Sequence, residues 1–400
     1  MESTSKKTLN RIKDAVKQQR DSPASKDQST VPIADAICAY WERDLLTFSI
    51  PAHNGGRGPA PEFTKWAGSQ AARADLPATH GIDTRNQVYK VQATAQQLFA
   101  DAVGAKQTLF STGGSSLSAR VAMMSVVGPG ETIVMARNGH KSAFAGLILS
   151  GARPVYVDPY YDEELELAHG VLVGDVLRAL DRHPEAKAVM IFTPSYYGTS
   201  ADIEAIAEAA HGHGVPLVTD DAWALDYAFG EHEDLPEPAL AQGADLAIGS
   251  VHKTLTGMSQ TSVLSVGSDR IDTERLALCF ELQESTSNSV LLLSSIDGAR
   301  AQFVREGQQL LERGLQGAAL VRDRLASEVP EIEVIDVQRL KSTPGVTGVD
   351  PTHILIEVAS IGITGYTAVD WLREHHHIDV ELVDHRRFMP LVSFAHGEAE

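Results

Sequence analysis

The segment Ser250-Val251-His252-Lys253 combines the side chains with the clearest chemical potential in this sequence. It directly follows an apolar run, residues 244–249, that predicts a short buried strand. Proteins with α/β folds place ligand-binding groups where such strands end. A lysine beside an imidazole and a hydroxyl at this position suits a Schiff base to a carbonyl cofactor. A surface lysine after a strand explains the tetrapeptide equally well, so the interpretation depends on the rest of the sequence.

Short apolar strands alternate with helices between about residues 95 and 266. Strands are predicted at residues 132–136, 154–157, 188–193, 216–219, 245–249 and 262–266. One helix between them is predicted to have Ser200 as its N-cap, with Gly214 closing its C-terminus. This alternation predicts an α/β fold with a mainly parallel sheet and helices on both faces.

The flanking regions predict three parts of the chain. Residues 1–50 read as a polar tail followed by a helix that begins at Pro32. Residues 51–328 form the large domain and end in a long helix over about 296–328. Residues 329–400 predict a small α+β domain, with strands at 333–337, 353–358 and 379–382 and a helix over 366–375 that follows Thr364.

Composition excludes several kinds of partner and site. The chain has 400 residues, 43% of them hydrophobic, and a net charge of −19, which argues against binding to nucleic acid or to an anionic membrane. No run approaches the length of a membrane helix. Only Cys38 and Cys279 occur, so we expect a reducing, cytoplasmic compartment and neither a disulfide framework nor a thiolate metal site. The contiguous His375, His376 and His377 have diverging rings, and no metal site is expected there.

A glycine- and serine-rich turn offers a place for a phosphate group. Thr112-Gly113-Gly114-Ser115-Ser116 precedes the predicted apolar helix 121–127. Backbone N–H groups and hydroxyls at a helix N-terminus bind phosphate, and glycines let the backbone approach it. An ordinary helix cap is the alternative explanation. Together with a Schiff-base lysine, a phosphate site indicates pyridoxal phosphate (PLP) as the carbonyl cofactor.

Two further strand ends supply the other groups that PLP needs. Asp220 ends the predicted strand 216–219 and would keep the pyridine nitrogen protonated, so that the ring can accept electrons. Asp221 is the competing carboxylate, but strand alternation turns it to the opposite face. Ala222 is small enough to pack beneath the ring. His140 follows the strand 132–136 and could stack on the ring, with a capping or core role as the alternative.

Five segments of the chain, in one order, resemble motifs of the bacterial ornithine/lysine/arginine decarboxylases, which are PLP enzymes of fold type I. They are residues 51–56 (PAHNGG, similar to PGHxxG), 137–142 (RNGHKS, similar to RNxHKS), 219–223 (TDDAW, similar to FDEAW), 250–261 (SVHKTLTGMSQT, similar to SxHKxL…TQ) and 285–289 (STSNS, similar to TTSPS). The resemblance extends from Pro51 to about Arg300 and is weaker beyond.

The resemblance implies a role for each candidate residue. Lys253 would bond covalently to PLP, His140 would stack on its ring and Asp220 would hold its nitrogen. The implied phosphate ligands are Ser115, Ser116, Ser250 and His252. Thr286 and Ser287 would reach the site from a neighbouring subunit, so a homodimer is the expected minimal active unit.

The implied reaction is decarboxylation of lysine, arginine or ornithine to an amine, a step of polyamine metabolism. A proton would return to Cα from Lys253 or His252. Two alternatives stay open: a PLP-dependent oxidase or aminotransferase, and a catalytically idle regulatory paralogue. The chain departs from the family pattern in Asn288, which replaces a proline, and in its serine-rich phosphate turn. It also ends at Glu400, whereas family members are expected to continue and to shape the substrate pocket there.

Overall fold

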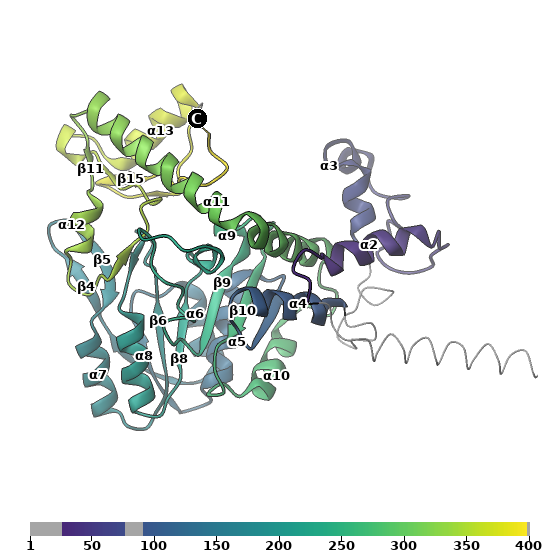
Figure 1. Ribbon diagram of the computed structural model, residues 1–400, viewed down its shortest axis with the longest axis horizontal. Helices are drawn as coiled ribbons and strands as arrows, with labels where there is room; N and C mark the ends of the chain where they lie inside the picture. Colours follow the sequence, from purple (N-terminus) through teal and green to yellow (C-terminus); the bar gives the residue numbers. More distant parts are fainter. Residues whose placement is uncertain (1–25, 77–90, 398–400) are drawn as a thin grey trace, which may run out of the picture.

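The computed structural model describes residues 26–76 and 91–397, and its centre is a seven-stranded sheet (Figure 1). The strand order is β1-β10-β9-β8-β6-β2-β3. Neighbours from β9 to β3 are parallel, whereas β10 runs antiparallel to β9 and to β1. The strands are β1 (Gln107–Ser111), β2 (Thr132–Ala136), β3 (Arg153–Val157), β6 (Ala186–Phe192), β8 (Leu217–Asp220), β9 (Leu246–Ser250) and β10 (Ser262–Val266). The predicted mainly parallel sheet is confirmed.

Helices cover both faces of this sheet. On one face α5 (Gly114–Val126) packs against α6 (Lys141–Ser150) and α10 (Thr273–Gln283). On the other, α7 (Val173–Arg182) lies beside α8 (Ile203–Gly212) (Figure 1). All five residues of β2 are buried, as expected of an inner parallel strand.

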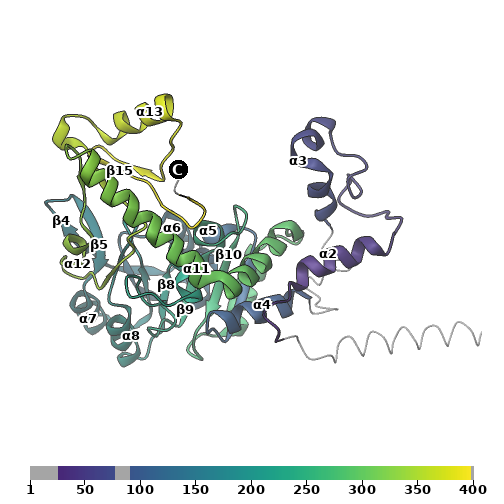
Figure 2. The ribbon, with the colours of Figure 1, turned by 45° about the horizontal axis from the view of Figure 1, so that its top comes forward.

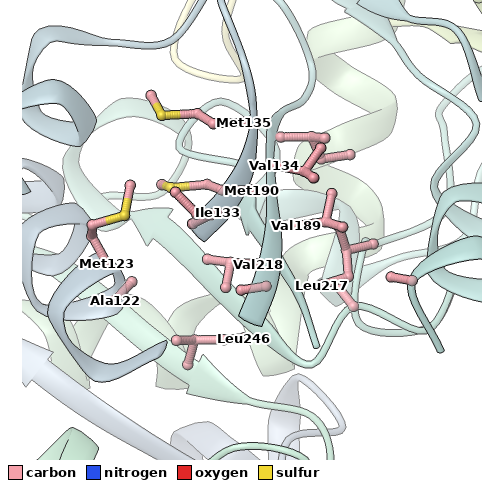
Figure 3. Packing of buried hydrophobic residues seen from close by; sticks show 14 of the residues in the cluster. Ala122, Met123, Ile133, Val134, Met135, Val189, Met190, Leu217, Val218 and Leu246 are labelled. Atoms are coloured by element: carbon pink, nitrogen blue, oxygen red, sulfur yellow. The ribbon is translucent and has the colours of Figure 1, made fainter. Parts of the chain in front are cut away.

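The core between the layers is built by alternation along the strands. Figure 3 shows Ile133 and Met190 on the side of the strands that faces Met123 of α5. Val134 and Val189 point to the opposite side. The five residues are at most 1% exposed, so strand and helix positions are fixed by apolar burial on both faces.

The predicted N-cap of α8 is wrong by two residues. Asp202 caps the helix, because its Oδ1 accepts a hydrogen bond from the backbone N–H of Ala205 at 3.0 Å. Ser200 lies instead in the short strand β7 (Thr199–Ser200), which pairs with β12 (Gly348–Val349). Gly214 follows the helix with a φ of 74°, the left-handed conformation expected at a helix end.

The C-terminal part contains a four-stranded antiparallel sheet of order β11-β13-β15-β14. Its elements are β11 (Glu333–Val334), α12 (Val337–Lys341), β13 (Ile356–Glu357), η3 (Ala359–Ile361), α13 (Gly365–His376), β14 (Leu382–Val383) and β15 (Arg387–Met389). The predicted helix after Thr364 is present as α13, and Thr364 is its N-cap. The strands are shorter than predicted, and the proposed strand 333–337 is interrupted because Asp336 caps α12.

A single long helix, α11 (Val290–Glu328), connects the large sheet to this small one (Figures 1 and 2). It begins six residues earlier than predicted, because Ser289 caps it by accepting from the N–H of Leu292. The domain boundaries after residues 50 and 328 stay predictions.

The N-terminal segment leaves the body of the molecule. The helix α2 (Pro32–Glu42) begins at Pro32 as predicted, and it continues to α3 (Pro61–Ala74), which projects away from the sheet in both views (Figures 1 and 2). Its base is held by a buried ion pair on α11, in which Arg300 lies 2.7 Å from Asp297. Asp297 Oδ2 accepts from the N–H of Ile33, and Arg300 donates to the carbonyls of Gln28 and Thr30.

Three connecting elements complete the part that surrounds the site. They are α4 (Val91–Ala102), which packs on β1, the helical turn η2 (Leu225–Phe229) and the hairpin of β4 (Pro159–Asp162) and β5 (Leu167–Val171). Within residues 26–76 and 91–397, no helix has both the length and the apolarity that crossing a membrane requires. Cys38 and Cys279 are both free.

Candidate active site

A cavity of about 170 Å³ lies at the carboxyl ends of β2, β6 and β8. This is the edge at which parallel α/β sheets bind ligands. Twelve residues from five separate stretches of chain line it: Ser115, Asn138, His140, Ala168, Phe192, Pro194, Ser195, Tyr196, Tyr197, Asp220, Ala222 and Trp223. Four of the predicted site residues, Ser115, His140, Asp220 and Ala222, are therefore gathered around one cavity.

The N-terminus of α5 forms one end of the site. Gly113 occupies the N-cap position, and no side chain caps the helix. Gly114 has a φ of 70°, which favours glycine, and its N–H donates to the carbonyl of Gln260 at 2.8 Å. Ser115 follows in the first turn and accepts a hydrogen bond from Ser250 Oγ at 2.9 Å. An uncapped helix start with two adjacent hydroxyls is suited to a phosphate group.

The two consecutive aspartates at the end of β8 face different surroundings. Asp220 is 9% exposed and lines the cavity. Burial raises the pKa of Asp220 to about 6, against the opposing effect of the Lys253 charge. Asp221 Oδ1 accepts from the N–H of Ile248 at 3.1 Å and from Thr219 Oγ1 at 3.2 Å. Burial, and next the Asp220 charge, raise the pKa of Asp221 to about 8.

Asp221 lies beside a separate, water-sized cavity of about 20 Å³ that Leu225 and Leu240 also line. The two carboxyl groups therefore diverge, as strand alternation predicts. A buried carboxylate needs a cationic partner, and a protonated pyridine nitrogen would provide one for Asp220.

Lys253 lies in the short helix α9 (Val251–Thr254), directly after β9. Its Nζ is 4.1 Å from the ring centroid of Trp223, which lines the cavity. Burial lowers the pKa of Lys253, while Asp220 and Glu381 oppose that shift. His252 lies 2.8 Å from the carbonyl of Thr261 through Nδ1. A carbonyl oxygen only accepts, so Nδ1 carries the proton of a neutral His252.

His140 is the N-cap of α6 and also lines the cavity. Its Nδ1 lies 2.7 Å from Ser142 Oγ and accepts from the backbone N–H of Ser142 at 3.3 Å. Burial lowers the pKa of His140, and the charge of Lys253 adds to this effect. The capping role and a position against a cofactor ring are thus compatible, because the cap uses Nδ1 while the side chain still lines the cavity.

Six predicted site residues lie outside the cavity lining. Two of them contact residues that do line it: Ser250 bonds to Ser115, and Lys253 contacts Trp223. His252 contacts Thr261 instead, and the other three lie elsewhere. Ser116 is half-buried in the first turn of α5 and does not line the cavity. Thr286 and Ser287 are exposed in the turn between α10 and α11, also outside the cavity lining. The sequence prediction assigned no role to Asn138 or Trp223, although both stand within the motifs. Ser195 and Tyr196 follow β6, and position at a strand end was the signal that could have found them.

The arrangement fits PLP by its own chemistry. It combines an uncapped helix N-terminus, a buried carboxyl and a half-buried imidazole around one cavity with a lysine that contacts Trp223 in the cavity wall. In the part of the chain that the structure describes, no cluster of three or more histidine, cysteine, aspartate or glutamate side chains could hold a metal ion. The mainly parallel sheet with a lysine at its edge defines the class: the fold is that of fold type I PLP-dependent enzymes.

The chain belongs to the Orn/Lys/Arg decarboxylase family, whose members are PLP-dependent lyases. The family model described as "Orn/Lys/Arg decarboxylase, major domain" matches residues 31–400. An arginine decarboxylase of Halalkalibacterium halodurans is 36% identical over 373 residues, which cover 93% of this chain and 75% of the relative. A lysine decarboxylase of Pseudomonas aeruginosa is 24% identical over 331 residues, which cover 74% of this chain and 43% of that relative.

Solved structures show the same fold. The constitutive lysine decarboxylase of Escherichia coli superposes with a TM-score of 0.77 at 20% sequence identity. The match covers 93% of this chain but 59% of that protein. This chain therefore spans about three fifths of the solved lysine decarboxylase, and the likeness concerns the fold alone.

Proposed function

We propose that this protein decarboxylates a basic L-amino acid to the corresponding amine and CO₂, with arginine as the first substrate to test. The observation that carries the proposal is that, in a chain of this family, Asp220 lines a cavity whose wall includes Trp223, the residue that Lys253 contacts. Arginine comes first because the arginine decarboxylase named above is 36% identical, against 24% for the lysine decarboxylase.

We propose the following residues as ligands of PLP. Lys253 would bond to the aldehyde carbon, Asp220 would bind the pyridine nitrogen, and His140 and Ala222 would contact the two faces of the ring. Ser115, Ser116, Ser250 and His252 would bind the phosphate. When bound, PLP supplies an electron sink for the charge that CO₂ leaves on Cα.

The remaining chemistry is proton transfer by the chain itself. Decarboxylation consumes one proton, which must reach Cα from a group near the cavity. The Nε2 of a neutral His252 holds a lone pair, because Nδ1 donates to Thr261. Lys253, as an ammonium, carries transferable protons beside Trp223. We therefore propose Lys253 as the donor and His252 as a positioning residue.

We also propose that the enzyme acts as a homodimer. Thr286 and Ser287 are exposed and lie outside their own chain's cavity, which leaves them free to complete the cavity of a second copy. The segment 45–66 supports association, because Phe48 is 94% exposed, Trp66 78% and Leu46 70%. Large apolar side chains grouped on one projecting segment are typical of a protein interface. Two free cysteines suit the reducing cytoplasm, which we propose as the compartment.

Product analysis tests this function directly. PLP-loaded protein is incubated with arginine, lysine and ornithine in separate vessels, and the products are identified by mass spectrometry. Agmatine, cadaverine or putrescine supports decarboxylation and names the substrate. Keto acids would replace the proposal with an aminotransferase or oxidase. A yellow, folded protein that turns over none of the three substrates would favour an idle paralogue.

A further inference from the structure

We propose that the indole face of Trp223 is the seat of the Lys253 ammonium whenever its amine is not bonded to the cofactor. Trp223 would then be a positioning residue that keeps the lysine protonated and close to the reacting carbon. The proposal rests on the function proposed above, because it concerns the same lysine.

The contact between the two side chains is direct. Nζ of Lys253 lies 4.1 Å from the centroid of the Trp223 ring, well within the range of a cation–π interaction. Tryptophan is the strongest aromatic partner for a cation, and the interaction gains strength where water is excluded. Trp223 is 7% exposed, so its indole is largely shielded from solvent.

The indole is held in place from the C-terminal part of the chain. His353 meets Trp223 with its ring 5.7 Å away at 76°, an edge-to-face contact. His353 is 1% exposed, and its Nδ1 lies 3.4 Å from Asp350 Oδ2, which also accepts from the hydroxyl of Tyr227 at 3.0 Å. Trp223 is therefore backed by a buried polar group and not by a mobile loop.

A second anchor fixes the turn that carries His353. Arg322 of α11 donates to the backbone carbonyls of Pro351 at 3.2 Å and of His353 at 3.0 Å. Tyr196 adds an edge contact to Trp223 at 6.4 Å. The position of the indole therefore depends on α11 and on the turn at residues 350–353, as well as on the strand that precedes it.

The charged groups around Lys253 explain why an aromatic seat is useful. Asp220 on β8 and Glu381 near β14 favour its ammonium form, while burial disfavours it. His140, on the α6 side, is disfavoured as a cation by the same lysine. Asp220 is committed to the pyridine nitrogen in the proposed site. An indole face stabilises the ammonium without a direct ion pair to a second carboxylate such as Glu381, which would retain the proton.

The contact with Trp223 affects the transfer of a proton from Lys253 to Cα. After CO₂ leaves, its former bonding electrons form a C–H bond, and an N–H bond of the Lys253 ammonium breaks. Lys253 is left as a neutral amine, the form that can bond again to the cofactor's carbonyl carbon. The cation–π contact weakens at the same moment, because a neutral amine is not attracted to the ring as a cation is.

The test measures protonation of Lys253 without any turnover. Full-length protein freed of PLP is treated with trace acetic anhydride across a pH series, and acetylation of the peptide that contains Lys253 is quantified by mass spectrometry. The midpoint of the pH profile reports the lysine pKa, while its plateau reports accessibility. Trp223→Leu should lower the midpoint, so that labelling below it, relative to the plateau, is about threefold to tenfold greater than in the wild type.

Two further variants make the result decisive. Trp223→Phe keeps a weaker aromatic face and should fall between wild type and Trp223→Leu. Trp371→Leu makes the same substitution on α13, where the indole is 51% exposed and contacts His376, and should leave the Lys253 profile unchanged. Far-UV circular dichroism selects the folded variants. A midpoint equal to the wild type in folded Trp223→Leu or Trp223→Phe overturns the proposal.

The failure of this inference is distinct from failure of the proposed function. A normal Trp223→Leu midpoint with agmatine formed by the wild type would remove only the role of Trp223. A shifted midpoint with no amine product from any substrate would remove the decarboxylase function and leave the lysine seat standing.

Discussion

The sheet edge around Lys253 and the projecting segment 45–66 differ in how their side chains are accommodated within one chain. Polar groups at the edge have hydrogen-bond partners, whereas apolar side chains of the segment are exposed to solvent. At the edge, Asp221, His252 and Ser250 each have a hydrogen-bond partner within the chain. In the projecting segment, Phe48 is 94% exposed. Burial of apolar surface is the main favourable contribution to folding and association, so exposure on this scale leaves a large contribution unused.

The cavity and the projecting segment are stabilised in different ways. The cavity is arranged in advance by strands whose positions are fixed by the core, as rigid binding sites require. The projecting segment has a firm base, at the Arg300–Asp297 pair, but no cover for its apolar tip. The groups at the sheet edge are thus largely satisfied within one chain, whereas the exposed N-terminal segment is the surface at which we propose that a second copy binds.

Replacing Lys253 should have the largest effect on the activity that we propose for the sheet edge. Lys253→Ala is expected to abolish the covalent bond to PLP and to reduce amine formation by about 10³-fold or more, the scale seen when a covalent catalyst is lost. Borohydride reduction followed by peptide mass spectrometry checks the bond. Lys187→Ala, at an exposed position of β6, is the matched control. A borohydride-stable PLP adduct on another lysine of the variant would contradict the assignment.

Breaking the base of the projecting segment should cost stability. Arg300→Met removes the partner of buried Asp297 and the donor to two backbone carbonyls, so the free energy of unfolding should fall by about 3–5 kcal/mol. Urea denaturation measures it. The double variant Arg300→Met with Asp297→Leu should recover part of the loss, because no unpaired buried charge remains. A loss below about 1 kcal/mol in the single variant would show that the ion pair does not anchor the segment.

A substitution in the exposed part of segment 45–66 should weaken dimerisation and not folding. Phe48→Ser is expected to weaken the dimer at least about tenfold, because burying a phenylalanine contributes about 1.5–3 kcal/mol. Analytical ultracentrifugation gives the dissociation constant. Ile378→Ser, at a 45% exposed position just after α13, serves as the control. Unchanged dimerisation in Phe48→Ser would place the interface elsewhere and contradict a role of segment 45–66 in association.

The smallest effect should be a change in pH dependence at the sheet edge. Because the pKa of Asp221 is raised to about 8, the folded state binds its proton more tightly than the unfolded state. Its contribution to stability is therefore present below pH 4 and is lost as pH rises towards 8. Asp221→Asn keeps an oxygen for the N–H of Ile248 and should flatten this decline by about 1 kcal/mol or more.

Urea titrations at pH 5 and pH 8 measure that slope. Asp323→Asn, at an exposed position of α11, is the control and should retain the wild-type decline. If Asp221→Asn and the wild type lose stability in parallel between the two pH values, Asp221 is ionised in the folded protein and the contrast between the two aspartates disappears.

The sequence predicts the fold well where the signal is local. Apolar runs locate all six predicted strands of the large sheet to within about two residues, and the helix predicted after Thr364 is found there as α13. The errors occur where two nearby residues could each begin a helix or where a capping residue interrupts an apolar run. Asp202, two residues beyond Ser200, is the actual cap of α8, and Asp336 begins a helix inside an apolar stretch. β1 was not predicted, because its five residues pair only with β10, more than 150 residues later.

The candidate site could be predicted in part for the same reason. Asp220 ends a recognisable strand, and Lys253 and His140 each follow one by a few residues, so the topology brings them to one edge. The contact of Trp223 with His353 depends on a turn 130 residues further along, which no local pattern encodes. The roles proposed for Thr286 and Ser287 require a second chain and stay predictions.

The helix α11 gives the molecule a mechanical property of its own. It is hydrogen-bonded at two points, by Arg300 to the N-terminal segment and by Arg322 to the turn behind Trp223. Those two residues are separated by about 33 Å along the helix axis. A tilt of about 5° at one point would therefore shift the other by about 3 Å, the length of a hydrogen bond. If α11 moves as a rigid rod, a displacement of the turn behind Trp223 would be transmitted to the base of the N-terminal segment, whose exposed part we propose as the dimer surface.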